Sequence, residues 1–477
     1  MNAFALENRP MEPTKSTLQI SRRHFLKASA FGAVGAVAGP LIVPSSLFGQ
    51  GAPGKKIQIA QIGCGRIARD MDMPGILKHY IARIVAVCDL DTKRVADAKK
   101  LVEGYYTKKS GSASAVTVKT FSDYRELLQM PGIDAVAIST PDHWHAELVI
   151  AAALAGKDVY VQKPLSMTLA EGRAVSDVIR KQGRIFQIGS QQRSNPQFRT
   201  GCELVRNGRI GKLHTVKIGL PSDPSGSVEP DMPVPPNLNY EMWFGPTPQV
   251  SYTEKRVHPQ NDYSRPGWLR IDSYCLGMIT GWGSHHVDIA HWGMDTEHTG
   301  PLEIEGKATF PKSGLWNVHG DYHIEARYAN GVNLIIDHTF ANGVEFQGED
   351  GWIFVSRGGG QATASDPASK TGKALAASDG KILSSKTGAN EIHLYLSNDH
   401  HGNWLESIQS RQPAVTTAEV AHRSTSTCIL SWISMKLRRK LRWDPVKEEF
   451  TGDAEANAMR RRLERKPYGI GKFAKQI

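Results

Sequence analysis

The stretch "IAQIGCGRIA", residues 59–68, has the pattern of a buried strand that enters a glycine turn and continues as a helix. The turn reads GxGxxA. Gly63 permits the tight turn, Gly65 lets a pyrophosphate approach the backbone, and Ala68 lets the helix pack closely on the sheet. Free N–H groups at the start of the helix add an anion site. The stretch therefore predicts a dinucleotide-binding loop.

The residues around this loop alternate between short apolar runs and segments of helix length, which is typical of a doubly wound parallel sheet. We expect such a domain over residues 52–188. Its predicted strands are "IQIAQIG" from 57, "IVAVCD" from 84, "AVAIST" from 135, "DVYVQKP" from 158 and "IFQIG" from 185. Its predicted helices cover residues 92–105, 122–130, 143–155 and 168–181, the last with a capping box.

The end of the second predicted strand indicates which dinucleotide binds. Asp89 lies there, about 20 residues beyond the glycine turn, where a carboxylate accepts hydrogen bonds from the adenosine ribose and repels a 2′-phosphate. This favours NAD. Lys93 and Arg94 follow closely, so NADP remains the alternative.

After Gly189 the pattern changes to a helix over residues 196–206 and then to strand-like runs. These predict a second domain, α+β with an open, largely antiparallel sheet, over residues 189–443, with helices resuming at 401–410 and 417–438. Residues 358–390 are rich in Gly, Ala, Ser and Lys and predict a mobile surface insertion. Residues 444–477 form a basic tail, which we expect to be solvated or to dock.

The first 51 residues have the layout of a twin-arginine export signal. Arg22 and Arg23 are followed by Phe25-Leu26-Lys27 and by a weakly apolar, Gly/Ala-rich run. That run is shorter than the roughly 20 residues that a spanning helix needs, which argues against a permanent anchor. We expect a periplasmic protein that meets the Tat translocase during export. A disordered basic N-terminus is the alternative.

Composition narrows the remaining classes. The formal net charge is +11, but the excess lies in the first 51 residues and beyond residue 436, so we expect no nucleic-acid partner. The five cysteines are scattered without a CxxC pair, which argues against a disulfide framework and a cysteine zinc site.

Two short motifs follow predicted strands at the edge where parallel sheets bind ligands: "TPDHWH", residues 140–145, and "QKP", residues 162–164. His143 and His145 fit a polar helix start. An HxH metal site of the amidohydrolase type is a rival reading, but it requires an eightfold barrel, so we predict no metal site. Lys163, at the end of a buried strand, can hold a substrate hydroxyl and stabilise an alkoxide.

The second half of the site is expected in "GMITGWGSHHVDIAHWG", residues 277–293. His285 and Asp288 share a helical face, and a histidine oriented by a carboxylate accepts a proton near neutral pH. A purely structural His–Asp pair is the alternative.

In this order, GxGxxA, Asp89, TPxxxH, the KP pair and the glycine-rich HxxD segment resemble the Gfo/Idh/MocA family of oxidoreductases. The resemblance runs from about residue 57 to 443. It implies a Rossmann domain, an α/β domain whose sheet often serves in oligomerisation, a nicotinamide cofactor and a sugar or polyol substrate. From the family it carries over Gly63, Gly65, Asp89, Thr140 and His145 for the cofactor and Lys163 and His285 for catalysis. The candidates that we add are, for the cofactor, Arg66, Ile67, Pro141 and Lys163, and for the substrate, Arg193, Trp282, His286 and Asp288.

Two positions depart from the family's pattern. The usual Glu of Glu-Lys-Pro is Gln162, and the acidic residue that commonly stands four before the catalytic histidine is Gly281. That acidic residue often grips a substrate hydroxyl. Its work falls to Trp282, to His286 or to a residue from elsewhere, or the space admits a larger substrate such as a glycoside.

These expectations together predict an exported, homo-oligomeric dehydrogenase that carries its NAD in a folded, tightly bound state and oxidises a ring carbinol of a sugar or glycoside, plausibly at C3. An NAD-dependent glycosidase that works by transient oxidation and elimination is the second reading. A sugar-binding or sensory protein that keeps the dinucleotide for structural reasons is the third.

Overall fold

The computed structural model describes residues 56–110, 117–358 and 373–477, which belong to one compact unit. The predicted export signal and residues 359–372 of the predicted insertion lie outside these ranges. Within them, no helix is both long and apolar enough to cross a membrane.

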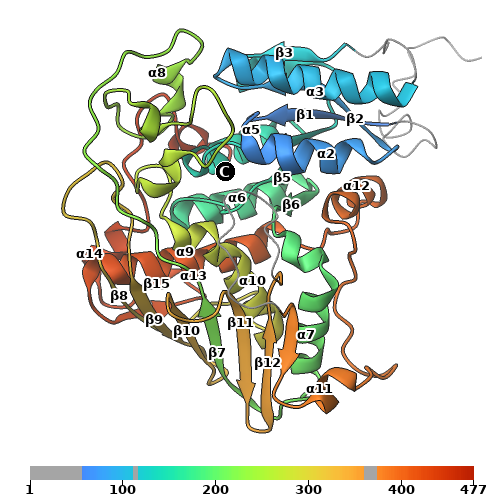
Figure 1. The fold of residues 1–477 in the computed structure, drawn as a ribbon, viewed down its shortest axis with the longest axis vertical. Coiled ribbons are helices and arrows are strands. Elements are labelled where there is room, and N and C mark those ends of the chain that lie inside the picture. Colours follow the sequence, from blue (N-terminus) through green and yellow to red (C-terminus); the bar gives the residue numbers. More distant parts are fainter. Residues whose placement is uncertain (1–55, 111–116, 359–372) are drawn as a thin grey trace, which may run out of the picture. The chain divides into compact units, whose positions relative to one another are not determined.

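The first half is a parallel six-stranded sheet in the order β3-β2-β1-β4-β5-β6 (Figure 1). All of its strand pairs are parallel, as the alternating pattern of the sequence predicts. The strands are β1 (Ile57–Ile62), β2 (Ala82–Cys88), β3 (Lys119–Phe121), β4 (Ala135–Ile138), β5 (Asp158–Val161) and β6 (Phe186–Ile188).

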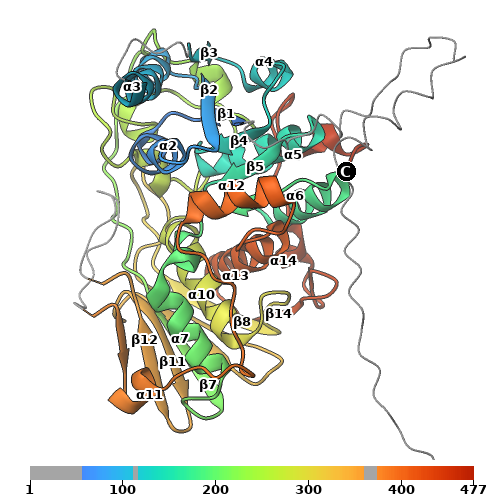
Figure 2. The same ribbon diagram turned by 90° about the vertical axis from the view of Figure 1, so that its right-hand side faces the viewer.

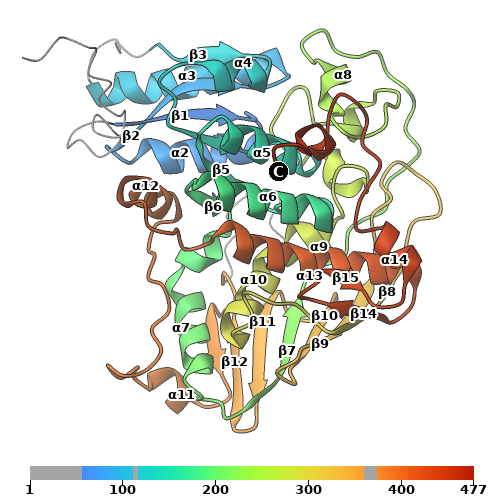
Figure 3. The ribbon, with the colours of Figure 1, turned by 180° about the vertical axis from the view of Figure 1, so that it is seen from behind.

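Helices cover both faces of this sheet. One face carries α2 (Met73–Leu77), α3 (Thr92–Ser110) and, from far along the chain, α12 (His400–Ser410), whose Trp404 and Leu405 join the same apolar cluster (Figure 2). The other face carries α4 (Tyr124–Gln129), α5 (His145–Leu154) and α6 (Leu169–Gln182) (Figure 3). The capping box at Thr168 is present, with Glu171 as its partner.

The second half is a nine-stranded sheet in the order β13-β12-β11-β7-β10-β9-β8-β14-β15. Only β7 and β10 pair in parallel, so the sheet is largely antiparallel as expected. Its strands are β7 (Leu213–Gly219), β8 (Glu303–Ala308), β9 (Tyr322–Arg327), β10 (Asn333–Asp337), β11 (Gly343–Gly348), β12 (Gly351–Val355), β13 (Leu375–Ala377), β14 (Leu441–Asp444) and β15 (Glu449–Phe450).

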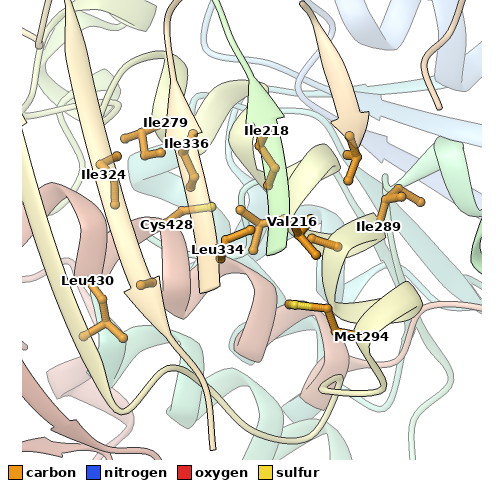
Figure 4. Packing of buried hydrophobic residues seen from close by; sticks show 14 of the residues in the cluster. Val216, Ile218, Ile279, Ile289, Met294, Ile324, Leu334, Ile336, Cys428 and Leu430 are labelled. Carbon is orange, nitrogen blue, oxygen red and sulfur yellow. The ribbon is translucent and has the colours of Figure 1, made fainter. Parts of the chain in front are cut away.

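Helices α10 (Gly283–Met294) and α13 (Ala418–Leu437) lie between the two sheets (Figure 1). Val216 and Ile218 of β7 and Leu334 of β10 point at Cys428 of α13 and Ile289 of α10 (Figure 4). All of these side chains are buried. This packing fixes α10, and with it His285, on the inner face of the second sheet. The remaining helices are α7 (Pro196–Arg206), α8 (Tyr240–Trp243), α9 (Met278–Gly281), α11 (Gly380–Ser384) and α14 (Ala454–Ala458).

One sequence-based expectation, the mobile insertion, is wrong, and the basic tail takes the docked form, one of its two expected states. Residues 373–390 are not a mobile insertion, because β13 pairs with β12 and α11 follows it. The basic tail is not solvated, because Lys472 pairs with buried Glu147 and Arg462 pairs with buried Glu171. Both helix carboxylates therefore neutralise the excess positive charge of the tail.

Candidate functional site

A cleft opens along the carboxyl edge of the parallel sheet and holds about 1440 Å³ of empty space, counted out to solvent. Both halves of the chain contribute to its walls. The predicted residues that line it are Gly63, Gly65, Arg66, Ile67, Asp89, Thr140, Pro141, Lys163, Gly281 and Trp282.

The glycine turn at one end of the cleft fits a pyrophosphate. Gly63 has a φ of +83°, and a Cβ there would lie 2.7 Å from the backbone of Ser139, so only glycine allows β1 and β4 to end this close together. A Cβ on Gly65 would meet nothing within 4 Å, which leaves the open space above the backbone that a bound phosphate needs. The first helical turn after it, Ala68–Asp72, is a π-helix and not the α-helix expected.

Asp89 lies at the end of β2 and lines the cleft with an anchored carboxylate. Its Oδ2 accepts from the Cys64 backbone N–H at 2.6 Å, and its Oδ1 accepts from the Asp91 N–H at 3.0 Å. These two bonds fix the negative charge where an adenosine ribose would present its hydroxyls. The geometry suits NAD, since a 2′-phosphate would meet this charge directly.

Residues 231–277, which we call the strap, cross from the second half of the chain to the rim of the cleft (Figure 1). The strap has an apolar core of its own, which includes Tyr240, Trp243 and Tyr274. Leu238 bridges to Asp91 backbone to backbone, and the Asp91 carboxylate binds His258 at 2.9 Å. The strap is therefore a packed element and not a loose loop.

Asp91 holds the strap as an anion. Burial raises the pKa of this carboxyl, but hydrogen bonds from His258 and Asn237 outweigh that effect and lower the pKa to about 2. The charge is consequently present throughout the physiological pH range, and so is the bond to His258.

A stacked group closes the strap over the adenosine end. The Tyr263 ring lies 4.4 Å from the guanidinium carbon of Arg69 and 4.5 Å from that of Arg94, and its hydroxyl donates to Asp97 at 2.9 Å. Arg94 also donates to the strap carbonyl of Pro259 at 2.9 Å. Arg94, a residue whose charge is compatible with NADP, is thereby used to hold the strap.

The motif at the end of β4 places its two histidines behind the cleft wall. His145 Nδ1 lies 2.6 Å from the carbonyl oxygen of Pro164, and burial lowers the pKa of His145 to about 4, so the neutral ring braces the turn that carries Lys163. His143 binds the carbonyl of Trp243 in the strap at 2.9 Å. His145 was expected on the cofactor surface, but it is 1% exposed and does not line the cleft.

The metal reading finds no supporting geometry, because both histidines of the motif bind backbone carbonyls. Within residues 56–110, 117–358 and 373–477, no three His, Cys, Asp or Glu side chains gather as they would around a metal ion.

A buried carboxylate that binds Gln162, the residue before Lys163, explains why the family's glutamate is replaced at position 162. Asp72 is 0% exposed and accepts from Gln162 Nε2 at 2.9 Å, from Ser139 Oγ at 2.7 Å and from His401 Nε2 at 3.0 Å. A glutamate at 162 would place a second carboxylate against Asp72, and like charges at that separation repel. Sequence reasoning missed Asp72, because a single aspartate in a short helix carries no local signal.

His285 is buried and, although it was expected to be catalytic, is not among the residues that line the cleft; no hydrogen-bond partner for its Nδ1 lies among the described residues. Burial lowers its pKa well below the ordinary value, and the positive charges of Arg357 and Lys163 lower it further. The imidazole is therefore neutral near pH 7 and lies close enough to Lys163 to feel its charge.

Asp288 does not orient His285, which corrects the expected His–Asp pair. Its carboxylate binds the Arg193 guanidinium at 2.7 and 2.8 Å and accepts from Ser424 Oγ at 3.1 Å. Arg193 and Asp288 are each 2% exposed, and neither lines the cleft. One turn of helix separates the two residues as the spacing implies, but the buried arginine competes for the carboxylate and wins it.

Of the other two residues expected to bind substrate, Trp282 lines the cleft and His286 does not. The Arg357 guanidinium carbon lies 4.6 Å from the Trp282 ring centroid. His286 points away and binds Asn342 at 2.8 Å, while burial lowers its pKa to about 4. A Cβ on Gly281 would meet nothing within 4 Å, so the missing acidic side chain leaves real space in the cleft.

Comparison with known proteins identifies both halves. Residues 57–190 match the description "Oxidoreductase family, NAD-binding Rossmann fold" of Gfo/Idh/MocA, and residues 225–359 and 383–470 match its "C-terminal alpha/beta domain". The chain is 35% identical over 122 residues to myo-inositol 2-dehydrogenase of Thermotoga maritima, which covers 26% of this chain and 34% of that one. The chain spans about half the length, or less, of this and similar oxidoreductase relatives.

A longer match joins the chain to a glycosyl hydrolase family 109 protein of Stenotrophomonas maltophilia, 27% identical over 365 residues, or 71% of this chain and 74% of that one. Among solved structures, the aldose-aldose oxidoreductase of Caulobacter crescentus, complexed with glycerol, shares the fold with a TM-score of 0.56 at 16% identity, over 81% of this chain and 100% of that one. The cofactor of this Rossmann domain is NAD. The chain belongs to the Gfo/Idh/MocA family of oxidoreductases.

Proposed function

We propose that this protein is an NAD-dependent oxidoreductase acting on a ring carbinol of a sugar or glycoside, plausibly at C3. The observation that carries the proposal is one cleft that brings together a phosphate cradle at Gly65, an anchored ribose carboxylate at Asp89 and a lysine at the sheet edge, Lys163. Relatives named as inositol dehydrogenases support the substrate class.

When bound, NAD supplies the carbon that takes hydride from the carbinol. The chain's own groups handle the accompanying proton. Lys163 contacts the reacting oxygen and stabilises the negative charge that develops on it. His285 takes the proton that the reacting hydroxyl releases; its imidazole is neutral, and its ring centroid lies 5.7 Å from that of the cleft-lining Trp282. The strap and Trp282 exclude water from this end of the cleft.

Open space at Gly281 supports a substrate larger than a free polyol. An acidic side chain at this position would project into the cleft, where a Cβ meets no atom within 4 Å. An aglycone can occupy this volume. We therefore place glycosides ahead of free inositols.

The strap supports a cofactor that stays bound between turnovers. Its contacts through Asp91, His258 and Tyr263 must all break before the adenosine end can leave the cleft. We propose that the protein folds around NAD, is exported by the Tat translocase and acts in the periplasm with this single cofactor molecule. We also propose that copies of the chain associate through the face of the nine-stranded sheet that lies opposite α10 and α13.

A retained cofactor also favours a second candidate, an NAD-dependent glycosidase. In that reaction, oxidation at C3 acidifies the neighbouring C–H, and elimination expels the aglycone. Water then adds to the resulting enone and hydride returns to C3, so no net NADH forms. The 365-residue match to a glycosyl hydrolase family 109 protein is the observation in its favour.

One assay separates the candidates. The purified protein is mixed with p-nitrophenyl glycosides and with the parent sugars, while the absorbance of reduced nicotinamide and of free nitrophenolate are followed together. Stoichiometric reduction without nitrophenolate supports the dehydrogenase, and catalytic nitrophenolate without net reduction supports the glycosidase. Sugar binding with neither signal contradicts both and points to the binding protein.

A further inference from the structure

Asp142 is a second carboxylate in the cleft that the family's pattern does not explain. It opens the short helical turn Asp142–Trp144 directly after β4 and is 4% exposed. Among the residues that line the cleft, only Asp89 and Asp142 carry a carboxylate. Asp89 is committed to two backbone N–H groups at the adenosine end. Asp142 is thus the one acidic group at the end where Lys163 and Gly281 lie.

The carboxyl of Asp142 is only partly satisfied by the protein, through a hydrogen bond with the Cys275 thiol. Its Oδ2 is fully buried and has no hydrogen-bond partner among the described residues. Buried polar oxygens are nearly always paired, because an unpaired one costs on the order of 1–3 kcal/mol. This unpaired oxygen belongs to a residue that lines the cleft, so a small rotation of the carboxyl would let it receive a hydrogen bond from a ligand.

The neighbours of Asp142 suit a hydroxyl ligand. Lys163 follows β5 and contributes a positive charge, and the Cys275 thiol comes from the strap and hydrogen-bonds with the carboxyl. Burial raises the pKa of Asp142 to about 7, and the charge of Lys163 partly opposes that rise. At neutral pH the carboxyl can therefore accept a hydrogen bond in one state and donate one in the other.

We propose that Asp142 binds a hydroxyl of the sugar substrate and so takes over the task of the acidic side chain that is missing at Gly281. In this chain the carboxylate stands after β4 and not at position 281 of the second domain. The cleft beside Gly281 is therefore free for the aglycone. This inference rests on the proposed function for its substrate class.

The test uses the NAD-loaded protein, its Asp142→Asn variant and Asp177→Asn, a matched change on α6 that does not line the cleft. NAD content, kcat and KM are measured with the p-nitrophenyl glycoside that the wild type uses best. Asp142→Asn is expected to keep its NAD, to raise KM at least tenfold and to flatten the rise of kcat/KM with pH that the ionising carboxyl produces. An unchanged KM and an unchanged pH profile would overturn the inference.

A second variant guards against a merely structural effect. Gly281→Asp, introduced into Asp142→Asn, returns a carboxylate to the open side of the cleft and is expected to recover part of the lost affinity toward the parent sugar. Asp142→Ala, which removes the carboxyl altogether, is measured beside these two variants. If KM rises in Asp142→Asn, the double variant recovers nothing and Asp142→Ala matches the wild type, then Asp142 does not bind the hydroxyl.

An infrared measurement separates failure of this inference from failure of the proposed function. The carboxyl band that disappears in Asp142→Asn is followed as methyl glucoside is added. If the wild type holds NAD and turns over glycosides but this band does not shift, only the inference fails. If the wild type holds no NAD and turns over nothing, the proposed function fails, and the band alone decides whether Asp142 meets sugar.

Discussion

Asp142 and Asp288 are both buried aspartates near the cleft, one after a Rossmann strand and one on α10, yet their surroundings differ. Asp288 is bound by Arg193 through two bonds and by Ser424, whereas one oxygen of Asp142 has no partner among the described residues. Burial with full pairing marks a group that holds the fold together. A buried carboxylate on a cleft wall with one unpaired oxygen is instead available to bind a ligand.

The Rossmann edge should carry the chemistry, and Lys163→Ala tests this most severely. Loss of the charge that stabilises the developing alkoxide is expected to lower kcat by about 10²- to 10⁴-fold. Single-turnover reduction of the bound NAD measures it, with thermal unfolding as the control. Near-normal turnover would move the chemistry away from this edge.

Asp288 on α10 is expected to contribute to the stability of the fold and not to catalysis. Asp288→Asn removes the main charge opposite Arg193, although Glu297 remains 2.6 Å from the same guanidinium. The free energy of unfolding is expected to fall by about 3 kcal/mol, because only Glu297 then compensates the buried Arg193 charge. Denaturant unfolding checks this. A variant as stable as the wild type would remove the contrast with Asp142.

Asp142 should make stability depend on pH. Its folded pKa of about 7 lies above the unfolded value of about 3.9, so the native state binds more protons between those values and stability falls as pH rises through this window. In nucleotide-free protein, Asp142→Asn should match the wild type near pH 4 and exceed it above pH 7, by on the order of 4 kcal/mol. Parallel unfolding curves across pH would contradict this.

A smaller change in the free energy of unfolding is expected from a second carboxylate beside Asp72. Gln162→Glu brings a second carboxyl within hydrogen-bond distance of Asp72. The pair must share a proton or repel, so we expect a loss of about 1–3 kcal/mol at pH 8 that shrinks toward pH 5. Unfolding at the two pH values measures it, and Gln162→Met serves as an uncharged control. A loss independent of pH would point to packing alone.

The smallest predicted effect concerns the strap. Tyr263→Ala removes the ring between Arg69 and Arg94, two cation–π contacts worth about 0.5–1 kcal/mol each at an exposed site. Release of NAD is expected to become about tenfold faster, since 1.4 kcal/mol corresponds to that factor. Loss of bound nucleotide on dilution gives the rate. Tyr395→Phe, outside the strap and the cleft, should leave it unchanged.

Five of the six strands of the parallel sheet could be predicted, because each is a mostly apolar run followed by a glycine or a polar turn. The strands β3 and β13 could not, since each has three residues and neither is fully buried. The glycine cradle, Asp89 and Lys163 lie next to strand ends and are visible locally. Asp288 was assigned to the wrong partner because Arg193, 95 positions away in sequence, leaves no local trace.

The same reasoning explains why Asp142 was overlooked. It stands inside the quoted motif "TPDHWH", but its role depends on which groups surround it in space, and Lys163 and Cys275 come from other segments. Burial of a carboxyl is a tertiary property. Sequence spacing indicated the right edge of the sheet but not which side chain at that edge remains unpaired.

The central claim is that this cleft holds NAD permanently and uses it on sugars, and nucleotide analysis tests it most directly. The protein is purified without added nucleotide, denatured, and its released small molecules are weighed by mass spectrometry before and after exposure to a glycoside. We predict about one NAD per chain, converted to NADH by the dehydrogenase reaction or returned as NAD with product released. A protein that emerges empty and takes up no NAD would contradict the claim.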